Sequence, residues 1–548
     1  MKDIEISNLC IKKNITEIAK DLGLDEDAVI SYGKYKAKIK ANDIMQGKNG
    51  KLILVTAINP TPYGEGKTTV TIGLVDALRH IEENAIGVLR EPSLGPVFGL
   101  KGGATGGGYS QIVPMEDINL HFTGDFHAIT SCNNLISAAI DNHIYHGNEL
   151  KIDPSSITFR RCLDVNDRAL REIETSINSE LKIKTRFDIT AASEIMNIFC
   201  LSKDLNELKY NLGNIIIGNN IEGKPIYTKD LKLDGALTAL LKEAFDPNLV
   251  QTLENNPVLV HGGPFANIAH GCNSIVATNL ALKLSDYVVT EAGFGADLGA
   301  EKFMDIKCRK GNLKPDCIIL TVTIRALKHN GEVNKEKINL ENIEGVKKGL
   351  ANLEVHIDNM RKFTSHIIVC LNKFTTDTDE EIDIVRNFCN EKLVQFSISE
   401  TYIKGGIGAL ALADKVREIC SRPNDFSLLY DEHLPITEKI DIICKEIYHA
   451  SSISYTDKAL KSIQYINRIE EHELPICIAK TQYSISDDPK KLGYPKDFEV
   501  LVRDIELHSG AGFITVFLGK ILTMPGLPKK PNYEIIDLDD KGNITGLF

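Results

Sequence analysis

Paired cysteines, long apolar runs and an excess of positive charge are all missing from this 548-residue sequence. Its 12 cysteines are scattered between Cys10 and Cys477 with no C-x-x-C pair, which argues against a zinc ribbon, an iron–sulfur cluster or a disulfide framework. Reduced thiols of this kind are typical of the cytosol. Residues 1–5 include acidic side chains and no apolar signal-peptide core. We therefore expect a cytoplasmic protein.

Two classes of partner are also disfavoured. No apolar run approaches the roughly 18–20 residues that a membrane-spanning helix requires, so we expect no membrane partner. The net charge of −12 disfavours a nucleic-acid partner, because phosphate backbones are bound by concentrated lysine and arginine. With 43% hydrophobic and 25% charged residues the composition is that of an ordinary globular protein, and the length allows about two to four domains.

A glycine-rich segment lies between an apolar run at residues 52–58 and an amphipathic stretch that reaches about Asn84. A strand, a glycine-rich turn and a helix in this order cradle nucleotide phosphates with backbone N–H groups and a helix N-terminus. Lys67 would reach the terminal phosphates, and the Thr68 hydroxyl would bind Mg²⁺. The usual pattern has glycine where Thr61 stands, and a bare G-x-G-K-T can arise by chance, but the flanking patterns favour a nucleoside-triphosphate site. The residues of the segment are Thr61, Pro62, Tyr63, Gly64, Glu65, Gly66, Lys67, Thr68 and Thr69.

Short apolar runs alternate with helical segments along most of the chain. This alternation predicts an α/β fold, with a parallel sheet of the P-loop NTPase type, helices on both faces and additional smaller α/β domains. The expected strands cover residues 52–58, 86–89, 258–261, 287–291, 317–323 and 366–371, and expected helices cover residues 275–284 and 343–361. Residues 1–150 and 250–370 would form the nucleotide-binding core, residues 151–249 a mainly helical insertion or second lobe, and residues 371–548 a C-terminal α/β region with a strand near residues 532–538.

Charged residues follow two of the expected strands. Arg90 ends the strand at residues 86–89, where its planar fork would clamp a second anion near the phosphate loop; the alternative is that Arg90 pairs with Glu91 or a neighbouring helix. Glu291 and Asp297 follow the strand at residues 287–290. Either would hold Mg²⁺ through water, or cap a helix. The spacing of His121 and His127 fits no common zinc motif, so we assign them no metal.

Glycine collects in four clusters, at residues 102–108, 262–263, 293–295 and 405–408. Loops at the carboxyl ends of parallel strands bind ligands, so these clusters favour a shared crevice over flexible surface turns. The run Asn372-Lys373-Phe374 is similar to the guanine-binding motif of GTPases. Its aspartate is missing, because residue 375 is threonine and Asp377 comes two residues late, so GTP is not the expected nucleotide.

Together these motifs resemble the formate–tetrahydrofolate ligase family in its stand-alone bacterial form. The resemblance implies a reaction in which ATP, formate and tetrahydrofolate give ADP, phosphate and 10-formyltetrahydrofolate through formyl phosphate. The matching segments run along essentially the whole chain, at residues 61–69, 90–108, 115–125, 291–303, 372–377 and 479–489.

The resemblance also implies roles for individual residues. The lysine and arginine that match Lys67 and Arg90 promote phosphoryl transfer, residues 61–68 hold ATP with its Mg²⁺, and an aspartate that matches Asp125 lies near the folate. Members of the family hold the pteridine between two aromatic rings. Phe374 matches one of them, and Tyr402 replaces the usual tryptophan, which this chain lacks. Tyrosine offers a smaller π-face, so folate binding is expected to be weaker.

Three further properties are implied by the resemblance. Members are typically homotetramers, and they are activated by a monovalent cation such as K⁺ or NH₄⁺, to which Glu91 would contribute. The C-terminal region would contribute to the folate site. Apart from the resemblance, the basic residues at 307–314 are candidates for meeting an anionic polyglutamate tail.

Three other interpretations remain. Regulatory ATPases with a similar loop carry a second lysine five residues before the loop lysine, but Pro62 occupies that position. Ligases that resemble dethiobiotin synthetase also activate carboxylates, but they are roughly half as long. A non-catalytic structural protein would give no reason for Lys67, Arg90 and four glycine clusters to occur together.

Overall fold

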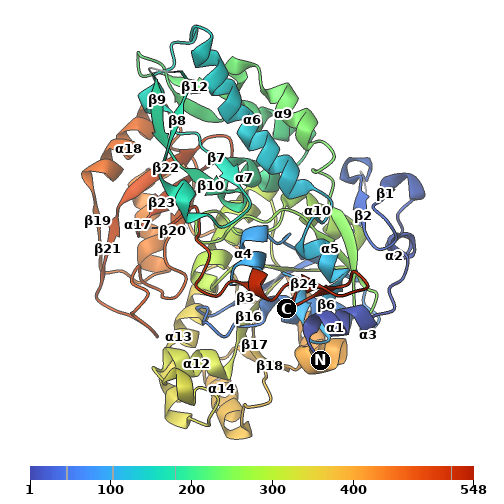
Figure 1. Cartoon of the computed structure of the whole chain (residues 1–548). Coiled ribbons are helices and arrows are strands. Elements are labelled where there is room, and N and C mark those ends of the chain that lie inside the picture. Colours follow the sequence, from blue (N-terminus) through green and yellow to red (C-terminus); the bar gives the residue numbers. More distant parts are fainter. Residues whose placement is uncertain (45–46, 101–103, 179–180, 520, 548) are drawn as a thin grey trace.

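One large mixed sheet organises the molecule (Figure 1). In the computed structural model, residues 1–44, 47–100, 104–178, 181–519 and 521–547 are described. Lys101, Gly102 and Gly103 of the first glycine cluster lie outside these residues. Neighbouring strands follow the order β1-β2-β13-β14-β4-β15-β3-β16-β17-β18, and all adjacent pairs from β14 to β18 are parallel. β1, β2 and β13 pair antiparallel, and β6 joins β13 and β5.

The predicted strands are confirmed to within about two residues at each end. They form because runs rich in valine, isoleucine and leucine can be buried on both sides of a parallel sheet. The strands of the large sheet are β1 (Val29–Ser31), β2 (Ala37–Ile39), β3 (Lys51–Ala57), β4 (Ala85–Leu89), β5 (Gly106–Gly107), β6 (Ser110–Val113), β13 (Asn248–Thr252), β14 (Pro257–Val260), β15 (Tyr287–Glu291), β16 (Cys317–Val322), β17 (Ile367–Asn372) and β18 (Gln395–Ser399).

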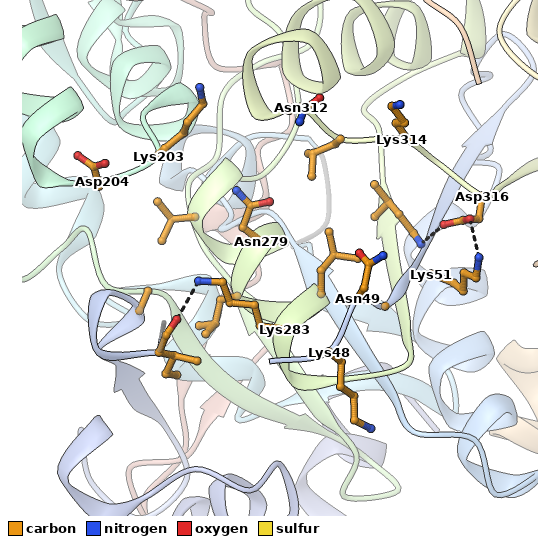
Figure 2. A pocket seen from close by; sticks show the side chains of 18 of the residues that line it. Lys48, Asn49, Lys51, Lys203, Asp204, Asn279, Lys283, Asn312, Lys314 and Asp316 are labelled. Carbon is orange, nitrogen blue, oxygen red and sulfur yellow. Dashed lines mark hydrogen bonds and ion pairs between the residues drawn. The ribbon is translucent and has the colours of Figure 1, made fainter. Parts of the chain in front are cut away.

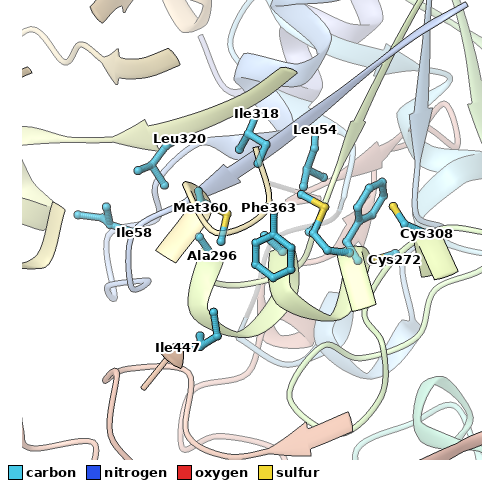
Figure 3. Packing of buried hydrophobic residues seen from close by; sticks show 14 of the residues in the cluster. Leu54, Ile58, Cys272, Ala296, Cys308, Ile318, Leu320, Met360, Phe363 and Ile447 are labelled. Atoms are coloured by element: carbon cyan, nitrogen blue, oxygen red, sulfur yellow. The ribbon is translucent and has the colours of Figure 1, made fainter. Parts of the chain in front are cut away.

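Successive residues of the central strands pack into different layers of core. Leu54 and Ile318 belong to the large cluster drawn in Figure 3, together with Met360 and Phe363. Ile53, one residue earlier than Leu54, belongs to a separate cluster on the other face. This two-residue alternation is what strand geometry requires when both faces of a sheet are covered.

Helices cover both faces, as predicted. Helices α3 and α16 supply the cluster on one face, and helices α10 and α13 supply the large cluster on the other. The predicted helices at residues 275–284 and 343–361 are confirmed as α10 and α13. The helices around the sheet are α1 (Asp3–Leu9), α2 (Ile15–Asp21), α3 (Lys67–His80), α4 (Leu94–Phe98), α5 (Met115–Asn119), α10 (Ile275–Leu284), α11 (Arg309–Gly311), α12 (Ile324–Asn330), α13 (Ile343–Met360), α14 (Asp379–Glu391), α15 (Thr401–Lys404) and α16 (Leu410–Cys420).

The segment at residues 151–249 is mixed rather than mainly helical. Its short strands were missed because their residues alternate between half-buried and exposed and carry many charges, so they lack an apolar run. With α6 it forms the teal and green part at the top of Figure 1. The elements are α6 (Asp125–Tyr145), β7 (Arg161–Leu163), β8 (Ile173–Ser176), β9 (Lys182–Thr185), β10 (Phe187–Ile189), α7 (Glu194–Leu201), α8 (Leu205–Gly213), β11 (Ile216–Asn219), β12 (Pro225–Tyr227) and α9 (Asp234–Leu241).

The C-terminal part adds small sheets beside the large one, drawn in orange and red at the left of Figure 1. β23 lies between β20 and β22, and β19 pairs with β21. Of the strand expected at residues 532–538, only Asp537–Leu538 is extended, because Asn532–Glu534 forms a 3₁₀ turn. No helix in the described ranges is long and apolar enough to span a membrane. The elements are α17 (Ile436–Glu446), β19 (Ser452–Tyr455), α18 (Asp457–Arg468), β20 (Ile476–Ala479), β21 (Glu499–Val502), β22 (Asp504–His508), β23 (Phe513–Phe517), β24 (Asp537–Leu538) and β25 (Ile544–Thr545).

Candidate functional site

The predicted phosphate loop connects β3 to α3 at the carboxyl edge of the sheet. Gly66 precedes the first residue of α3 and has φ 73°, a left-handed conformation that favours glycine. A Cβ at Gly66 would lie 2.2 Å from Nδ2 of Asn372, which donates a hydrogen bond to the Glu65 carbonyl at 3.2 Å. Asn372, which the sequence linked to a guanine motif, therefore supports the loop from the end of β17.

The loop is also closed by its own side chains. Glu65 is buried, and its carboxylate accepts a hydrogen bond from the Thr61 amide at 2.6 Å. The Thr61 hydroxyl in turn accepts a hydrogen bond from the Tyr63 amide at 3.3 Å. Burial raises the pKa of Glu65, while the positive charge of Lys67 opposes that shift. Threonine in place of the usual glycine thus has a structural partner within the loop.

Lys67 and Thr68 begin α3 beside a glutamate from the next strand. The Thr68 hydroxyl donates a hydrogen bond to Oε2 of Glu291, the last residue of β15, at 2.8 Å. Burial lowers the pKa of Lys67, and the nearby charge of Arg90 lowers it further, whereas Glu65 and Glu291 oppose the shift. A helix N-terminus, an ammonium group and a carboxylate thus lie together where β3 and β15 end.

Arg90 lies in a cavity with this helix start. The cavity has a volume of about 430 Å³, and its lining includes Thr68, Arg90, Glu291, Gly263 and Gly293. Arg90 donates a hydrogen bond from Nη1 to the Pro264 carbonyl at 3.2 Å, and a Cβ on Gly293 would lie 3.0 Å from Nη1. The alternative pairing is not seen: within the described residues, Arg90 forms no ion pair with Glu91. Gly293 thus lets its loop approach the guanidinium closely.

Asp297 is engaged elsewhere. Its Oδ2 forms an ion pair with Nζ of Lys480 at 2.7 Å, and both side chains are almost fully buried. Its Oδ1 accepts a hydrogen bond from Asn59, which follows β3, at 3.1 Å. The Asn59 amide donates to Nε2 of His356 at 3.0 Å, and burial lowers the pKa of His356 to about 4, which keeps the imidazole neutral. Asp297 therefore connects the start of the predicted phosphate loop to the C-terminal part.

Glu91 and Asp125 lie in a second buried group. Asp125, at the start of α6, pairs with Nζ of Lys38 at 2.8 Å, and Asn248 donates to its other oxygen at 2.7 Å. Glu91 is 5% exposed, and within the described residues its Oε2 has no hydrogen-bond partner. Burial raises the pKa of Glu91 well above its usual range, the Asp125 charge raises it further, and Lys38 opposes both.

The comparison with known families shows to which family the chain belongs. The family model described as formate–tetrahydrofolate ligase matches residues 1–548, the whole chain. The chain belongs to the formate–tetrahydrofolate ligase family. It is therefore an enzyme that ligates formate to tetrahydrofolate, a reaction of one-carbon metabolism, with ATP and tetrahydrofolate among its substrates.

The two aromatic residues that the resemblance assigns to folate binding have different surroundings in the structure. Phe374 follows β17, and the Arg325 guanidinium lies 4.2 Å from the centroid of its ring. Tyr402 is 47% exposed; its ring packs beside Gly107, and its hydroxyl donates to Oδ1 of Asp3 at 3.2 Å. Both rings lie near the carboxyl ends of strands, and their role as a pair stays a prediction.

The glycine clusters of the ligase serve two purposes. Those at residues 262–263 and 293–295 contribute to the cavity around Arg90. The cluster at residues 405–408 instead packs against α3, because a Cβ on Gly406 would lie 2.6 Å from Cβ of Asp76. The expectation of one crevice shared by all clusters is wrong for this one, since close helix packing also requires glycine.

One expected binding residue is not available, and one structurally important residue was not predicted. Lys307, from the basic residues considered for a folate tail, is fully buried and donates to Asn273 and Thr278 at 2.8 Å each, so it is not available to a tail. Lys480 was missed, although it lies in the segment at 479–489 that matches the family. The sequence feature that could have identified Lys480 is its position directly after an apolar strand. Within the described ranges, no group of three histidine, cysteine or acidic side chains could hold a metal ion.

Proposed function

We propose that the ligation proceeds through formyl phosphate, formed when formate attacks the γ-phosphorus of ATP in the cavity beside Arg90. Formate alone is a poor acylating agent, because its carboxylate is resonance-stabilised and oxide is a poor leaving group. Transfer of the phosphoryl group gives a mixed anhydride whose leaving group is phosphate. The amine of tetrahydrofolate then attacks the formyl carbon and releases phosphate, giving 10-formyltetrahydrofolate.

The observation that carries this proposal is the shared cavity of the helix α3 N-terminus and Arg90. The obstacle to the first step is repulsion between two anions, formate and the triphosphate. Lys67 would neutralise the transferring oxygens, and the planar fork of Arg90 would orient formate in line. The charge of Arg90 contributes to the lowered pKa of Lys67, which supports a joint action of the two cations on one negatively charged group.

Residues 61–68 would hold the phosphates of ATP, and the oxygens of Thr68 and Glu291 fit Mg²⁺. Hydroxyl and carboxylate oxygens are the ligand types that Mg²⁺ prefers, and it usually binds through one or two protein oxygens plus the nucleotide. Bound there, Mg²⁺ would supply positive charge to the phosphates. The hydrogen bond from Thr68 to Glu291 places the two oxygens 2.8 Å apart.

Phe374 and Tyr402 would enclose the pteridine. Asp125 is already engaged by Lys38 and Asn248, which favours a structural and electrostatic contribution over free proton transfer. Glu91 fits a monovalent cation, because a buried carboxylate oxygen without a partner gains from a positive charge. K⁺ or NH₄⁺ bound there would favour the charged form of Glu91. We also propose that the enzyme is a homotetramer and that it is cytoplasmic.

A coupled assay for 10-formyltetrahydrofolate, with each substrate omitted in turn, tests the proposal. Product should require ATP, formate and tetrahydrofolate together, and ATP hydrolysis should be slow without formate. Lys67→Ala should abolish product. The control is Lys335→Ala, which removes an exposed lysine that does not line the cavity and should leave turnover unchanged. Near-normal turnover in Lys67→Ala would remove that residue from the mechanism.

A further inference from the structure

A second cavity lies at the opposite edge of the large sheet. It has a volume of about 790 Å³ and is bounded by the start of β3 at Lys51 and Leu52, by α10 and by the loop before β16 (Figure 2). Because β3 runs from this cavity to the nucleotide loop, its seven residues separate the two sites by roughly 20 Å. A ligand bound here would not compete with ATP.

The charge of this cavity is opposite in sign to that of the chain. Acidic residues outnumber lysine and arginine by 12 in the sequence, yet lysines outnumber aspartates in the lining. Such a reversal concentrates a positive potential in one concave place, which attracts anions. The charged residues of the lining are Lys48, Lys51, Lys203, Lys283, Lys314, Asp204 and Asp316.

Part of this charge is neutralised within the protein. Lys51 pairs with Asp316 at 3.1 Å, and Lys48 pairs with Asp286 at 2.7 Å. Lys283 donates only to a neutral group, the Ile44 carbonyl, at 2.8 Å. Lys283 therefore keeps its full positive charge beside the cavity.

Two further ammonium groups have no partner. In the described part of the chain, Nζ of Lys203 and Nζ of Lys314 take part in no ion pair or hydrogen bond, and both side chains are exposed (Figure 2). Asp204, the acidic neighbour of Lys203, is used as the N-cap of α8, where it accepts from the Asn206 and Glu207 amides. Besides its ion-paired residues, the lining thus has three lysines without a counter-charge among the described residues and one carboxylate that is engaged as an N-cap.

The rest of the lining suits an organic ligand rather than a bare ion. Leu52, Val276, Leu280 and Leu313 are buried and form an apolar floor. The side-chain amides of Asn49, Asn279 and Asn312 also line the cavity (Figure 2). Cavities of roughly 300–1,000 Å³ with an apolar floor and a few polar groups are the usual form of small-molecule sites.

We propose that this cavity binds a phosphate monoester of about nucleotide size. Its dianionic phosphate would bind to one or more of Lys203, Lys283 and Lys314, and its organic part would cover the apolar floor. Lysine is a common phosphate ligand because it is a compact point charge on a flexible stem. The ordinary alternatives are that these lysines only solvate the surface, or that another subunit covers them.

Pyridoxal 5′-phosphate is a direct probe, because its aldehyde forms an imine with a lysine close to its bound phosphate. The enzyme is treated without nucleotide, the imine is fixed with borohydride, and peptide mass spectrometry maps the modified lysines, which separates the cavity lysines from Lys67. We expect modification of the cavity lysines about tenfold above that of exposed Lys335 and Lys337, and a loss of this preference with pyridoxal, which lacks the phosphate.

Variants and competitors complete the test. Lys203→Gln should lower modification at Lys314, and Lys314→Gln should lower it at Lys203, while Lys335→Gln changes neither; retained ligase activity shows that each variant is folded. AMP should protect the cavity lysines, and citrate at the same ionic strength should not. Equal modification by both reagents, protection by citrate alone, or unreactive cavity lysines covered by another subunit would each overturn the proposal.

Discussion

At the scale of single residues, the active cavity places cations where anions must meet. Lys67 is half-buried as a residue, but burial of its ammonium group and the charge of Arg90 lower its pKa, so two positive charges repel each other there. Bound phosphates and formate would relieve this repulsion, which favours binding of the reacting anions together. The sequence predicted that Lys67 and Arg90 lie near each other. The structure places Arg90 and Thr68, the residue after Lys67, in the lining of one cavity, and it adds a hydrogen bond from Thr68 to Glu291 that the sequence did not predict.

Replacing the proposed folate-stacking residues tests their pairing. Phe374→Ala and Tyr402→Ala should each raise the KM for tetrahydrofolate by about tenfold while leaving the KM for ATP unchanged, because one stacked ring contributes roughly 1–3 kcal/mol. Tyr402→Trp should lower the folate KM by enlarging the π-face. Tyr402→Phe, which removes only the hydrogen bond to Asp3, is the matched control. An unchanged folate KM in both alanine variants would refute the sandwich.

Asp76 on α3 makes stability depend on pH. Burial raises the pKa of its carboxyl to about 8, with a smaller contribution from Glu254, and its Oδ1 accepts hydrogen bonds from Thr252 and Asn256. Between pH 4 and pH 8 the folded chain retains a proton that the unfolded chain has lost, so stability falls as pH rises, by at most about 1.4 kcal/mol per pH unit.

Asp76→Asn keeps the accepting oxygen and removes the titration. The variant should therefore gain thermal stability relative to the native protein between pH 5 and pH 8, as measured by the difference in Tm at each pH. The control is Asp379→Asn, a nearly fully exposed carboxylate at the start of α14. A Tm difference for Asp76→Asn that stays constant over this range would contradict the assigned protonation.

At the scale of elements, the loop after β3 is fixed by contacts with the C-terminal part as well as by its own hydrogen bonds. Lys480 follows β20, yet through Asp297 it reaches Asn59 at the entry to the nucleotide loop. The Lys480 ammonium also donates to the carbonyls of Thr481 and Ser484, at 3.1 and 2.6 Å. The C-terminal segment thus fixes the geometry of a site formed by the first half of the chain.

Lys480→Met should destabilise the protein by about 3–5 kcal/mol, because it leaves Asp297 buried without a counter-charge. It should also raise the KM for ATP, since Asn59 loses a fixed partner. The double variant Asp297→Asn/Lys480→Met should lose less stability than the sum of the two single variants. Additive losses measured by urea unfolding would show that the two side chains do not act as a pair.

The elements that sequence predicted best are those whose burial is complete. Strands such as β15 and β16 are apolar on both faces, so a continuous hydrophobic run marks them with little ambiguity. Strands β8 and β9 are half-exposed, and their charged residues resemble those of a surface helix or loop. The partners of Asp125 and Asp297 were also beyond prediction, because Lys38 and Lys480 are distant in sequence and only the fold brings them close.

At the scale of the whole molecule, two cavities lie at opposite edges of one sheet in a chain of net charge −12. Both contain lysine or arginine, and each is formed where strands begin or end. Parallel strands make this division possible, because every strand start lies at one edge and every strand end at the other. The proposed ligation site belongs to the carboxyl edge, and the proposed phosphate-ester site belongs to the amino edge.

The central claim is that the γ-phosphoryl group is transferred directly to formate. The most direct measurement supplies formate labelled with ¹⁸O on both oxygens, together with ATP and tetrahydrofolate, and analyses the released phosphate by mass spectrometry. The formyl phosphate route predicts one ¹⁸O atom in each phosphate and the other in the formyl group of the product. Phosphate that carries no ¹⁸O, released in step with 10-formyltetrahydrofolate, would contradict it.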